Sequence, residues 1–241
     1  MPVSSPEQER VERLGESINY TAGFNEKNSE FISREAAHFY GGDSCLVLGP
    51  SESGEFEKTL SSHFKRVVCV DGSSRIINEL RRKLPAYEYN ISLFEDIQIE
   101  EKFDVILLMH VLEHVRDPQQ ILSLCKKWLA KEGVVIVATP NAYSINRLLG
   151  VKMGLLSEAH ELHENDLRIG HRRVYDFDSL ERDIKAAGFT VVEKQGVLFK
   201  PFPNSQMELL SNGQIEGLYL LGKDFPNYCN SLFFVIKPNE L

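Results

Sequence analysis

Apolar residues in the chain fall into short runs that alternate with longer segments in which apolar positions recur every three or four residues. The short runs are typical of buried strands, and the longer segments are typical of helices with one face on a core. The predicted strands cover residues 44–49, 66–71, 87–92, 102–109, 134–140, 190–199 and 231–238. The predicted helices between them cover residues 53–64, 73–84, 117–133, 176–189 and 204–222. This alternation predicts an α/β fold with a doubly wound, mostly parallel sheet covered on both faces.

Two segments depart from the alternation. Residues 1–40 are polar with helical spacing, and residues 141–175 place an amphipathic stretch and a strongly polar stretch directly after the fifth predicted strand. Open α/β sheets bind their ligands at the carboxyl edge, so the second segment is expected to be a substrate-side insertion. With 241 residues and 42% hydrophobic content, the chain is expected to form one domain, residues 1–241.

Composition narrows the class of partners. The net charge of -8 argues against a nucleic-acid partner, because surfaces that bind nucleic acid neutralise phosphates with basic residues. No apolar stretch approaches the length of a transmembrane helix, and the polar N-terminus differs from a signal peptide. The widely spaced cysteines give no disulfide pattern; they are Cys45, Cys69, Cys125 and Cys229. We therefore expect a cytoplasmic protein without a membrane partner, and either a monomer or a homodimer.

The first predicted strand runs into a turn with the sequence GPSESG, residues 49–54. Glycine lets the main chain approach a ligand, and the N-terminus of the following helix favours negative charge. Asp71 ends the second predicted strand about 20 residues further on, where a carboxylate accepts hydrogen bonds from ribose hydroxyls. The turn lacks the full patterns of dinucleotide and triphosphate sites. Turn and carboxylate together therefore predict a site for an adenosine without phosphate.

The segment MHVLEHV, residues 109–115, has two interpretations. Its H-x-x-E-H spacing is that of a zinc hydrolase in which one helix presents two histidines and a carboxylate. Alternatively, it is the end of the buried strand at residues 102–109, at the edge where a nucleotide lies. Because Pro118 limits a helix after His110 to about two turns, the second interpretation is favoured.

Five segments together resemble the class I S-adenosylmethionine-dependent methyltransferases. They are LVLGPSESG, VVCVDGSS, FDVILLMHVLEHVRDPQQIL, LAKEGVVIVATPN and GHRRVYDFDSLERDIKAAGF. The resemblance covers residues 44–189 and is nearest to the small-molecule branch, which includes ubiquinone-biosynthesis O-methyltransferases and many sugar and natural-product methyltransferases. It implies a Rossmann-like sheet of seven strands with the last one antiparallel, S-adenosylmethionine as the cofactor, and an N-terminal helical lid in residues 1–40.

The resemblance also implies a set of cofactor contacts. Residues 49–54 would wrap the methionine moiety, Asp71 would bind the ribose, residues 93–95 would flank the adenine, and residues 109–110 would lie beside the sulfonium. The implied cofactor-binding residues are Tyr20 in the lid, Gly49, Pro50, Ser51, Glu52, Gly54, Asp71, Gly72, Leu93, Phe94, Glu95, Met109 and His110. Val47 stands where relatives carry an acidic residue, and Glu52 is the candidate replacement toward the amino group of the cofactor.

Glu113 and His114 have a possible metal role by the same resemblance, because some ubiquinone-pathway relatives place a divalent ion near this pair. The preferred interpretation is structural, with both side chains tied to neighbouring main chain. No metal ion is therefore expected.

Methyl transfer requires an acceptor atom that is held close to the methyl carbon and freed of its proton. Histidine suits proton transfer at neutral pH, and the candidate bases are His110 and His171, with a structural contact as the alternative for His171. The candidate acceptor-binding residues follow the fifth strand or lie in the insertion; they are Asn141, Tyr143, Asn146, Arg147, His160, His163 and Arg172. A solvated face is the alternative for His160 and His163.

The sequence thus predicts an enzyme that transfers a methyl group from S-adenosylmethionine to an oxygen or nitrogen of a small polar metabolite. A sugar, a nucleotide-linked sugar or a natural-product intermediate is the preferred acceptor, with a protein or a lipid as the other acceptor classes. The alternatives are an S-adenosylmethionine-binding protein without catalysis, for which the altered glycine turn is the only hint, and a zinc-dependent hydrolase.

Overall fold

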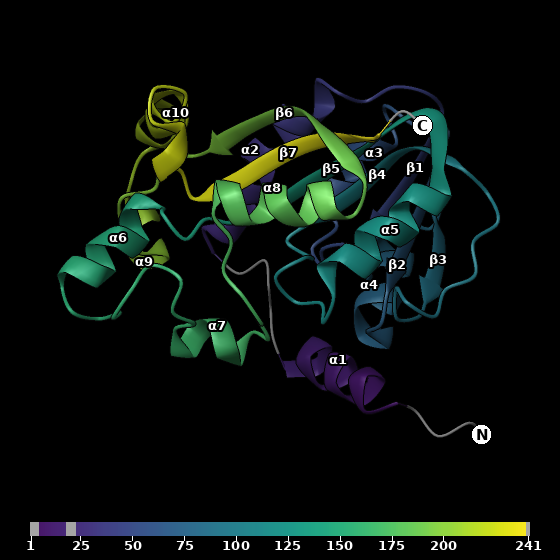
Figure 1. The fold of residues 1–241 in the computed structure, drawn as a ribbon, viewed down its shortest axis with the longest axis horizontal. Helices are drawn as coiled ribbons and strands as arrows, with labels where there is room; N and C mark the ends of the chain where they lie inside the picture. Colours follow the sequence, from purple (N-terminus) through teal and green to yellow (C-terminus); the bar gives the residue numbers. More distant parts are fainter. Residues whose placement is uncertain (1–4, 18–22, 240–241) are drawn as a thin grey trace.

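The computed structural model describes residues 5–17 and 23–239, in which helices pack on both faces of one sheet (Figure 1). The strands are β1 (Ser44–Leu48), β2 (Arg66–Asp71), β3 (Glu88–Ile91), β4 (Phe103–Met109), β5 (Leu129–Pro140), β6 (Phe189–Val197) and β7 (Ser231–Pro238). The helices are α1 (Pro6–Ser17), α2 (Asn25–Ala37), α3 (Glu55–Leu60), α4 (Ser74–Lys83), α5 (Pro118–Trp128), α6 (Ile145–Lys152), α7 (Glu164–Arg168), α8 (Phe177–Ala186), α9 (Asn204–Met207) and α10 (Asn212–Leu221), with a 3₁₀ turn at Pro226–Tyr228.

The strand order within the described residues is β3-β2-β1-β4-β5-β7-β6. The first five strands of this order are parallel to one another, and β7 is antiparallel to both β5 and β6. The predicted fold class, a mostly parallel sheet of seven strands with the last one antiparallel, is confirmed. Because Ser231 pairs with both Pro140 and Val197, the carboxyl ends of β5 and β6 and the start of β7 meet at one edge.

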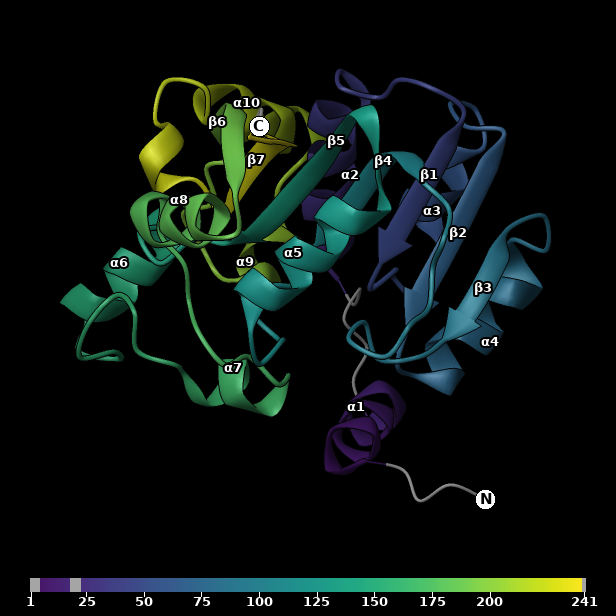
Figure 2. The same cartoon turned by 45° about the vertical axis from the view of Figure 1, so that its right-hand side comes forward.

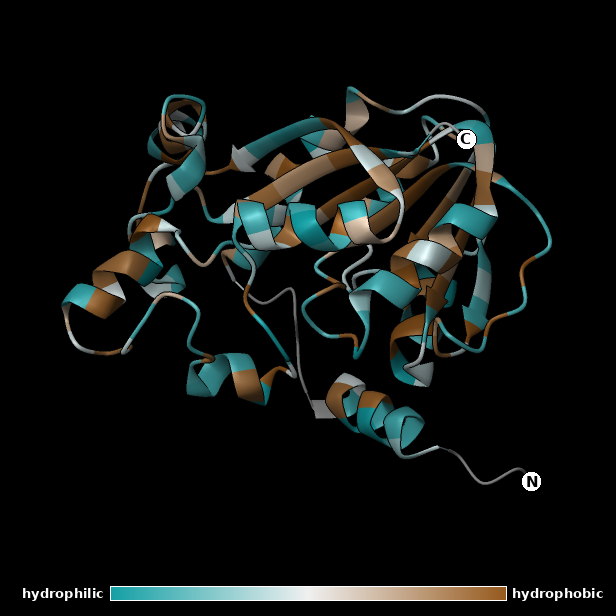
Figure 3. Cartoon of the chain, viewed as in Figure 1, coloured by the Kyte–Doolittle hydropathy of each residue, from teal (hydrophilic) through white to brown (hydrophobic). Residues whose placement is uncertain are grey.

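Two apolar cores cover the two faces of the sheet. Along β1, Leu46 and Leu48 point into the core that contains α5 and α8, while Cys45 and Val47 point into the core that contains α2, α3 and α10. This follows from the two-residue period of a strand, which sends successive side chains to opposite faces. Figure 3 shows that the central strands are mostly apolar, whereas the helices turn polar residues outward. The short apolar runs of the sequence are therefore strands buried on both faces.

The boundary between α5 and β5 differs from the sequence prediction. The prediction that this helix extends to Gly133 was wrong, because α5 ends at Trp128 and Leu129 has strand dihedrals of φ -84° and ψ 138°. Leu129 pairs with Phe103 of β4, and both side chains are buried. Because this pairing buries both apolar side chains, the strand conformation is favoured at Leu129 over a further turn of helix.

Helix α1 lies at the carboxyl ends of the strands and packs against α4 (Figure 2). Glu7 of α1 forms ion pairs with Arg10 (3.0 Å), with Arg116 of the loop after β4 (2.9 Å) and with Arg172 of the insertion (2.9 Å). Arg10 also donates to the carbonyl of Gly170 at 2.7 Å. These contacts hold α1 over the edge of the sheet. None of the described helices combines the length and apolar content of a membrane span.

Candidate functional site

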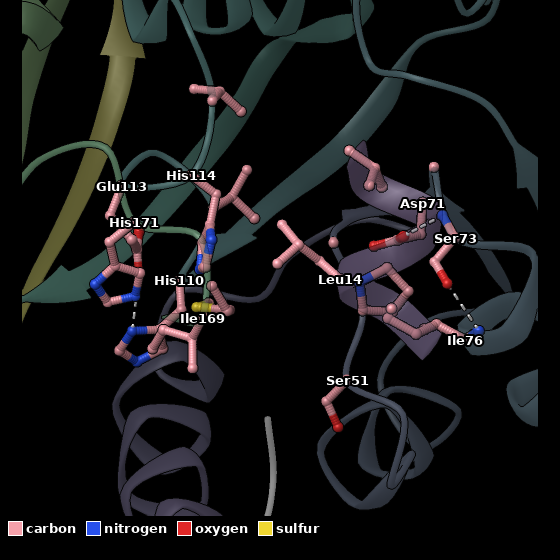
Figure 4. Close-up of a pocket in the computed structure, with 18 of the residues that line it drawn as sticks. Leu14, Ser51, Asp71, Ser73, Ile76, His110, Glu113, His114, Ile169 and His171 are labelled. Carbon is pink, nitrogen blue, oxygen red and sulfur yellow. Dashed lines mark hydrogen bonds and ion pairs between the residues drawn. The ribbon is translucent and has the colours of Figure 1, made fainter. Parts of the chain in front are cut away.

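A cavity of about 400 Å³ lies at the carboxyl ends of β1, β2 and β4 and is covered by α1 and α2 (Figure 4). This volume is in the range of sites for small molecules. Its wall has two sides, which meet at Met109 and His110. The "glycine-loop side" consists of Val47, Gly49, Pro50, Ser51, Glu52, Glu57, Asp71, Gly72, Leu93, Phe94 and Glu95. The "asparagine side" consists of Asn25, Asn28, Ser29, Pro140, Lys200 and Asn230.

Gly49 brings the main chain close to the cavity. Its φ is +67°, and its N–H donates to the carbonyl of Val70 at 2.9 Å. A Cβ atom at this position would lie only 2.7 Å from Cγ2 of Val111. Glycine is therefore required by both backbone conformation and space. Gly54, with φ of +73°, precedes α3 and does not line the cavity.

The buried carboxylate of Glu57 binds the main chain of the glycine turn. The N–H of Ser51 donates to Oε1 of Glu57 at 2.6 Å. Glu57 is 1% exposed, and its Oε2 has no hydrogen-bond partner among the described residues. Burial raises the pKa of Glu57 to about 7. In contrast, the carboxylate of Glu52 pairs with Arg75, so its charge is already compensated.

Asp71 ends β2 and faces the same cavity. Its Oδ1 accepts a hydrogen bond from the N–H of Ser73 at 2.7 Å, and Ser73 in turn caps α4 by accepting from Ile76. Burial raises the pKa of Asp71 to about 7, although the hydrogen bond from Ser73 opposes the shift. Figure 4 shows Asp71, Ser73 and Ile76 across the pocket from His110.

His110 follows β4 in a left-handed conformation, with φ of +59°. Its Nδ1 lies 3.2 Å from Oε1 of Glu113, and its Nε2 lies 3.5 Å from Nδ2 of Asn28. Burial raises the pKa of Glu113, but the hydrogen bond with His110 and the neighbouring histidines outweigh it and hold that pKa below its ordinary value. Because Glu113 accepts and Asn28 donates in this arrangement, the network places the imidazole proton on Nδ1 and leaves Nε2 as an acceptor.

Three side chains near His110 form a group that could hold a metal ion. Ligand atoms of Glu113, His114 and His171 lie within 4.8 Å of one another, and this is the one such group in the part of the chain that the structure describes. Burial lowers the pKa of His114 to about 4, so its imidazole is neutral at pH 7. Neutral imidazoles and a carboxylate are ordinary ligands of divalent ions. The expectation of no metal ion stays a prediction.

The histidines of MHVLEHV do not lie on one helix. The chain forms turns between His110 and Asp117, and α5 begins only at Pro118. Asp117 caps that helix by accepting from the N–H of Gln120 at 3.0 Å. The arrangement of a zinc-hydrolase helix is therefore absent from this segment.

A family model described as a methyltransferase domain matches residues 13–194. The chain belongs to this methyltransferase family. The ubiquinone biosynthesis O-methyltransferase of Rhizobium etli (strain CIAT 652) is 31% identical over 129 residues, which are 51% of this chain and 48% of the relative. The chain thus spans about half the length of the curated relatives that it matches.

Solved structures share the fold of this methyltransferase at low identity. The N-methyltransferase NodS from Bradyrhizobium japonicum WM9, in complex with S-adenosyl-L-homocysteine, is 15% identical, with a TM-score of 0.61 over 98% of this chain and 100% of that chain. The 1,6-didemethyltoxoflavin-N1-methyltransferase of Burkholderia thailandensis is 14% identical, with a TM-score of 0.62 over 100% of this chain and 93% of that chain. At these identities the likeness shows the fold alone.

The structure gathers most residues that the sequence marks for the cofactor on one wall of the methyltransferase. Those that line the cavity are Gly49, Pro50, Ser51, Glu52, Asp71, Gly72, Leu93, Phe94, Glu95, Met109 and His110. Gly54 lies behind this wall, where a Cβ atom would be 3.1 Å from Leu80. Tyr20 lies outside the described residues. Of the candidate bases, both His110 and His171 line the cavity.

The candidate acceptor-binding residues are placed differently. None of the seven lines the cavity; they are Asn141, Tyr143, Asn146, Arg147, His160, His163 and Arg172. Arg147 donates to the carbonyl of Ala159 at 2.6 Å and pairs with Asp166 at 3.1 Å. His160 lies 2.9 Å from Asp176. These polar groups hold the insertion together.

Three further members of this set, Asn141, His163 and Arg172, also bind within the protein. Asn141 is 2% exposed and donates to the carbonyls of Asn227 and Cys229, each at 2.9 Å. His163 caps α7 by accepting from the N–H of Asn165 at 3.2 Å. Arg172 joins the insertion to Glu7, as described above, and donates to the carbonyl of His114 at 2.9 Å.

Several polar residues of the cavity wall have no counterpart among the sequence-predicted ones, among them Asn28, Glu57, Lys200 and Asn230. Of these, only Glu57 could have been found from the sequence, because a carboxylate on the apolar face of a helix is unusual. Glu57 lies on the face of α3 that also carries the buried Phe56 and Leu60. The other three come from separate segments that the fold brings to one edge.

Proposed function

We propose that this protein transfers a methyl group from S-adenosylmethionine to an oxygen or nitrogen of a small polar acceptor. The observation that carries the proposal is that a glycine turn and the carboxylate of Asp71 face one cavity at the carboxyl ends of the strands. That edge is where open α/β sheets bind nucleotide ligands. Membership of the methyltransferase family and the names of the curated relatives support the same activity.

The ribose fits Asp71. One carboxylate oxygen is already bound by the N–H of Ser73, which fixes the orientation of the group. No described residue donates a hydrogen bond to the other oxygen, which can therefore accept from the ribose hydroxyls. A hydrogen bond to an ionised carboxylate contributes roughly 1.5 to 3 kcal/mol.

The amino group of the methionine moiety fits Glu57. Val47, on the strand beneath, is apolar, and the carboxylate of Glu52 is paired with Arg75. Glu57 lines the cavity and has a buried oxygen without a partner in the described residues, which is a costly arrangement unless a ligand completes it. An ammonium group there would compensate the carboxylate. Glu57 is therefore proposed in place of Glu52.

The apolar part of the wall fits a purine. Leu93 and Phe94 follow β3, and Ile76 and Val111 line the same region. A Cβ atom on Gly72 would lie 2.8 Å from Val11 of α1 and 3.2 Å from Leu93, so glycine there lets these side chains close over the ligand. A water-excluding cover of this kind strengthens the electrostatic contacts beneath it.

Bound S-adenosylmethionine would supply an electrophilic methyl carbon on its sulfonium. The acceptor atom must lose a proton as it bonds to that carbon, and Nε2 of His110 is the acceptor for this proton. Glu113 holds the opposite ring nitrogen at 3.2 Å and stabilises the imidazolium that forms. His110 joins the two sides of the wall, where the methyl group and the acceptor would meet.

The acceptor is proposed to be a sugar, a nucleotide-linked sugar or a natural-product intermediate that occupies the asparagine side. The relatives are named O-methyltransferases, which favours oxygen over nitrogen. All four cysteines are buried and free, which supports a reducing compartment such as the cytoplasm.

Two measurements test the proposal. Calorimetry should show that the protein binds S-adenosylhomocysteine, and incubation with S-adenosylmethionine and a panel of hydroxylated and aminated metabolites should release S-adenosylhomocysteine with at least one of them. Failure to bind S-adenosylhomocysteine would contradict the proposal. Binding without turnover on any acceptor would instead indicate a cofactor-binding protein without catalysis.

A further inference from the structure

Lys200 is the residue of the asparagine side that the proposed function does not yet use. The chain leaves β6 through Leu198, which is buried and has a φ of +64°. This left-handed conformation is unfavourable for leucine and persists only where the surroundings fix it. The N–H of Asn230 donates to the carbonyl of Leu198 at 2.7 Å, which ties the turn to the start of β7. The turn carries Lys200 to the wall of the cavity.

The ammonium group of Lys200 has no ion pair or hydrogen bond among residues 5–17 and 23–239. The other cations at the cavity differ, since Arg10 and Arg116 both pair with Glu7, at 3.0 and 2.9 Å. Lys200 is partly buried, and burial lowers its pKa to about 8. At pH 7 it is therefore still mostly protonated, and an anion that enters the cavity would compensate it.

The neighbouring polar groups cannot supply this charge. Nδ2 of Asn28 donates to Oγ of Ser231 at 3.0 Å, and Nδ2 of Asn230 donates to Oδ1 of Asn28 at 3.1 Å. This network links α2 to the start of β7 and is neutral. The asparagine side contains no acidic residue. Glu113 of the adjoining wall accepts from His110 through Oε1, and its Oε2 has no partner among the described residues, so it does not pair with Lys200. The negative partner of Lys200 is therefore expected to come from the ligand.

We propose that Lys200 binds a carboxylate of the methyl acceptor, so that the substrate is a small organic acid whose reacting oxygen or nitrogen faces His110. This inference rests on the proposed function. A single ammonium group suits a carboxylate, which carries one negative charge. A phosphate or diphosphate is usually held by several cations or by a row of main-chain N–H groups, and the asparagine side has neither. Among the acceptors considered above, acids are thus favoured over nucleotide-linked sugars.

The experiment uses protein saturated with S-adenosylhomocysteine, which cannot react, and pairs of acids with their primary amides. Suitable pairs of increasing size are glycolate with glycolamide, benzoate with benzamide, and indole-3-acetate with indole-3-acetamide. At least one acid should bind the parent protein more tightly than its amide, by roughly 10- to 150-fold, the range for a charged hydrogen bond. Lys200→Met should abolish this preference without weakening amide binding, and Lys200→Arg should retain most of it.

Lys131→Met is the matched control, because Lys131 is exposed on β5 and its loss changes the net charge equally. It should bind acids as the parent does. The inference is overturned if no acid binds, if acids and amides bind equally, or if the preference survives in Lys200→Met. Both Lys200 variants should bind S-adenosylhomocysteine as the parent does, which also reports that they fold. If the parent itself fails to bind S-adenosylhomocysteine, the proposed function falls together with the inference, whereas binding without acid preference overturns the inference alone.

Discussion

On the glycine-loop side of the cavity most of the wall consists of short runs of consecutive residues, whereas on the asparagine side it consists of separate side chains from α2, the end of β5, the turn after β6 and the residue before β7. Residues 49–52, 71–72 and 93–95 each lie at the end of a strand or just after it, so strand position alone brings them to the same edge. Asn28, Lys200 and Asn230 come from a helix, from the turn after β6 and from the residue before β7. The position of residues on the glycine-loop side is therefore set by where the strands end, whereas the position of residues on the asparagine side is set by tertiary packing.

This difference has a chemical counterpart. On the glycine-loop side, burial raises the pKa of two carboxyl groups, Asp71 and Glu57, to about 7, and Oε2 of Glu57 has no hydrogen-bond partner among the described residues. On the asparagine side, the charged group is a cation, Lys200, and the rest of the wall is neutral. His110 lies between them. A cationic cofactor and an anionic acceptor would each meet the opposite charge.

The largest effect is expected at the junction of the two sides. His110→Asn should lower the turnover rate by roughly 100- to 10,000-fold, because proton transfer from the acceptor loses its base. The affinity for S-adenosylhomocysteine should change little. Steady-state kinetics with calorimetry check this, with His63→Asn, an exposed histidine that does not line the cavity, as the control. If the loss appears instead in His171→Asn, the base lies on the insertion.

Glu57→Gln tests the carboxylate of the glycine-loop side. Glutamine keeps the shape of the side chain and can still accept from Ser51, but it cannot compensate an ammonium group. We expect the dissociation constant for S-adenosylhomocysteine to rise roughly 10- to 150-fold. Glu55→Gln, an exposed position on the same helix, should bind as the parent does. An unchanged affinity in Glu57→Gln would show that another residue binds the amino group of the methionine moiety.

The same two carboxyl groups should make cofactor binding depend on pH. Burial raises the pKa of both Asp71 and Glu57 to about 7 in the ligand-free protein, while the ligand favours their ionised forms. Binding therefore releases protons, and affinity should be full above pH 7 and fall as the pH drops below it. The expected loss is up to about tenfold per pH unit for each group. Titrations between pH 5.5 and 8 measure it, and an affinity that is flat or rises toward acid pH would contradict the assignment.

A smaller effect is expected in the insertion. Arg147→Met removes the ion pair with Asp166 and the donor to Ala159, so stability should fall by about 1 to 3 kcal/mol, a few degrees in melting temperature. Binding of S-adenosylhomocysteine should be unchanged. Thermal unfolding checks this, with Arg82→Met of α4, an exposed arginine, as the control. A stable variant with a raised KM for the acceptor would favour the acceptor-binding role predicted from the sequence.

No effect is expected from chelation. If Glu113 and His114 are structural, exhaustive treatment with EDTA should leave turnover intact, as measured by release of S-adenosylhomocysteine. Loss of turnover that magnesium or zinc restores would show that the group formed by Glu113, His114 and His171 binds an ion. The two sides of the cavity would then meet at a metal site.

Most of the fold was accessible from the sequence because apolar runs buried on both faces are a strong signal for parallel strands. The end of α5 could not be predicted from the sequence, because Leu129 continues the helical pattern. Its conformation is determined by its pairing with Phe103. Helix propensity depends on residues that are near in the sequence, whereas the burial of a cross-strand pair depends on residues that are far apart in it.

The site divides in the same way. Gly49 follows β1 and Asp71 ends β2, so their place was predictable from the order of elements along the chain. Lys200 and Asn230 were not, because their position depends on the left-handed turn at Leu198 and on the antiparallel register of β6 with β7. Polar residues of the insertion were predicted to bind the acceptor because of their composition, yet Arg147, His160 and Arg172 contact other parts of the protein instead of lining the cavity.

The central claim is that the glycine-loop side binds the adenosine of S-adenosylmethionine through Asp71. Calorimetric titration of the parent, Asp71→Ala and the exposed control Asp224→Ala with S-adenosylhomocysteine tests it most directly. We expect tight binding by the parent and the control, and binding by Asp71→Ala that is weaker by roughly 10- to 150-fold with little change in melting temperature of the ligand-free protein. Equal affinity in all three proteins, or no binding by the parent, would rule out this role of Asp71.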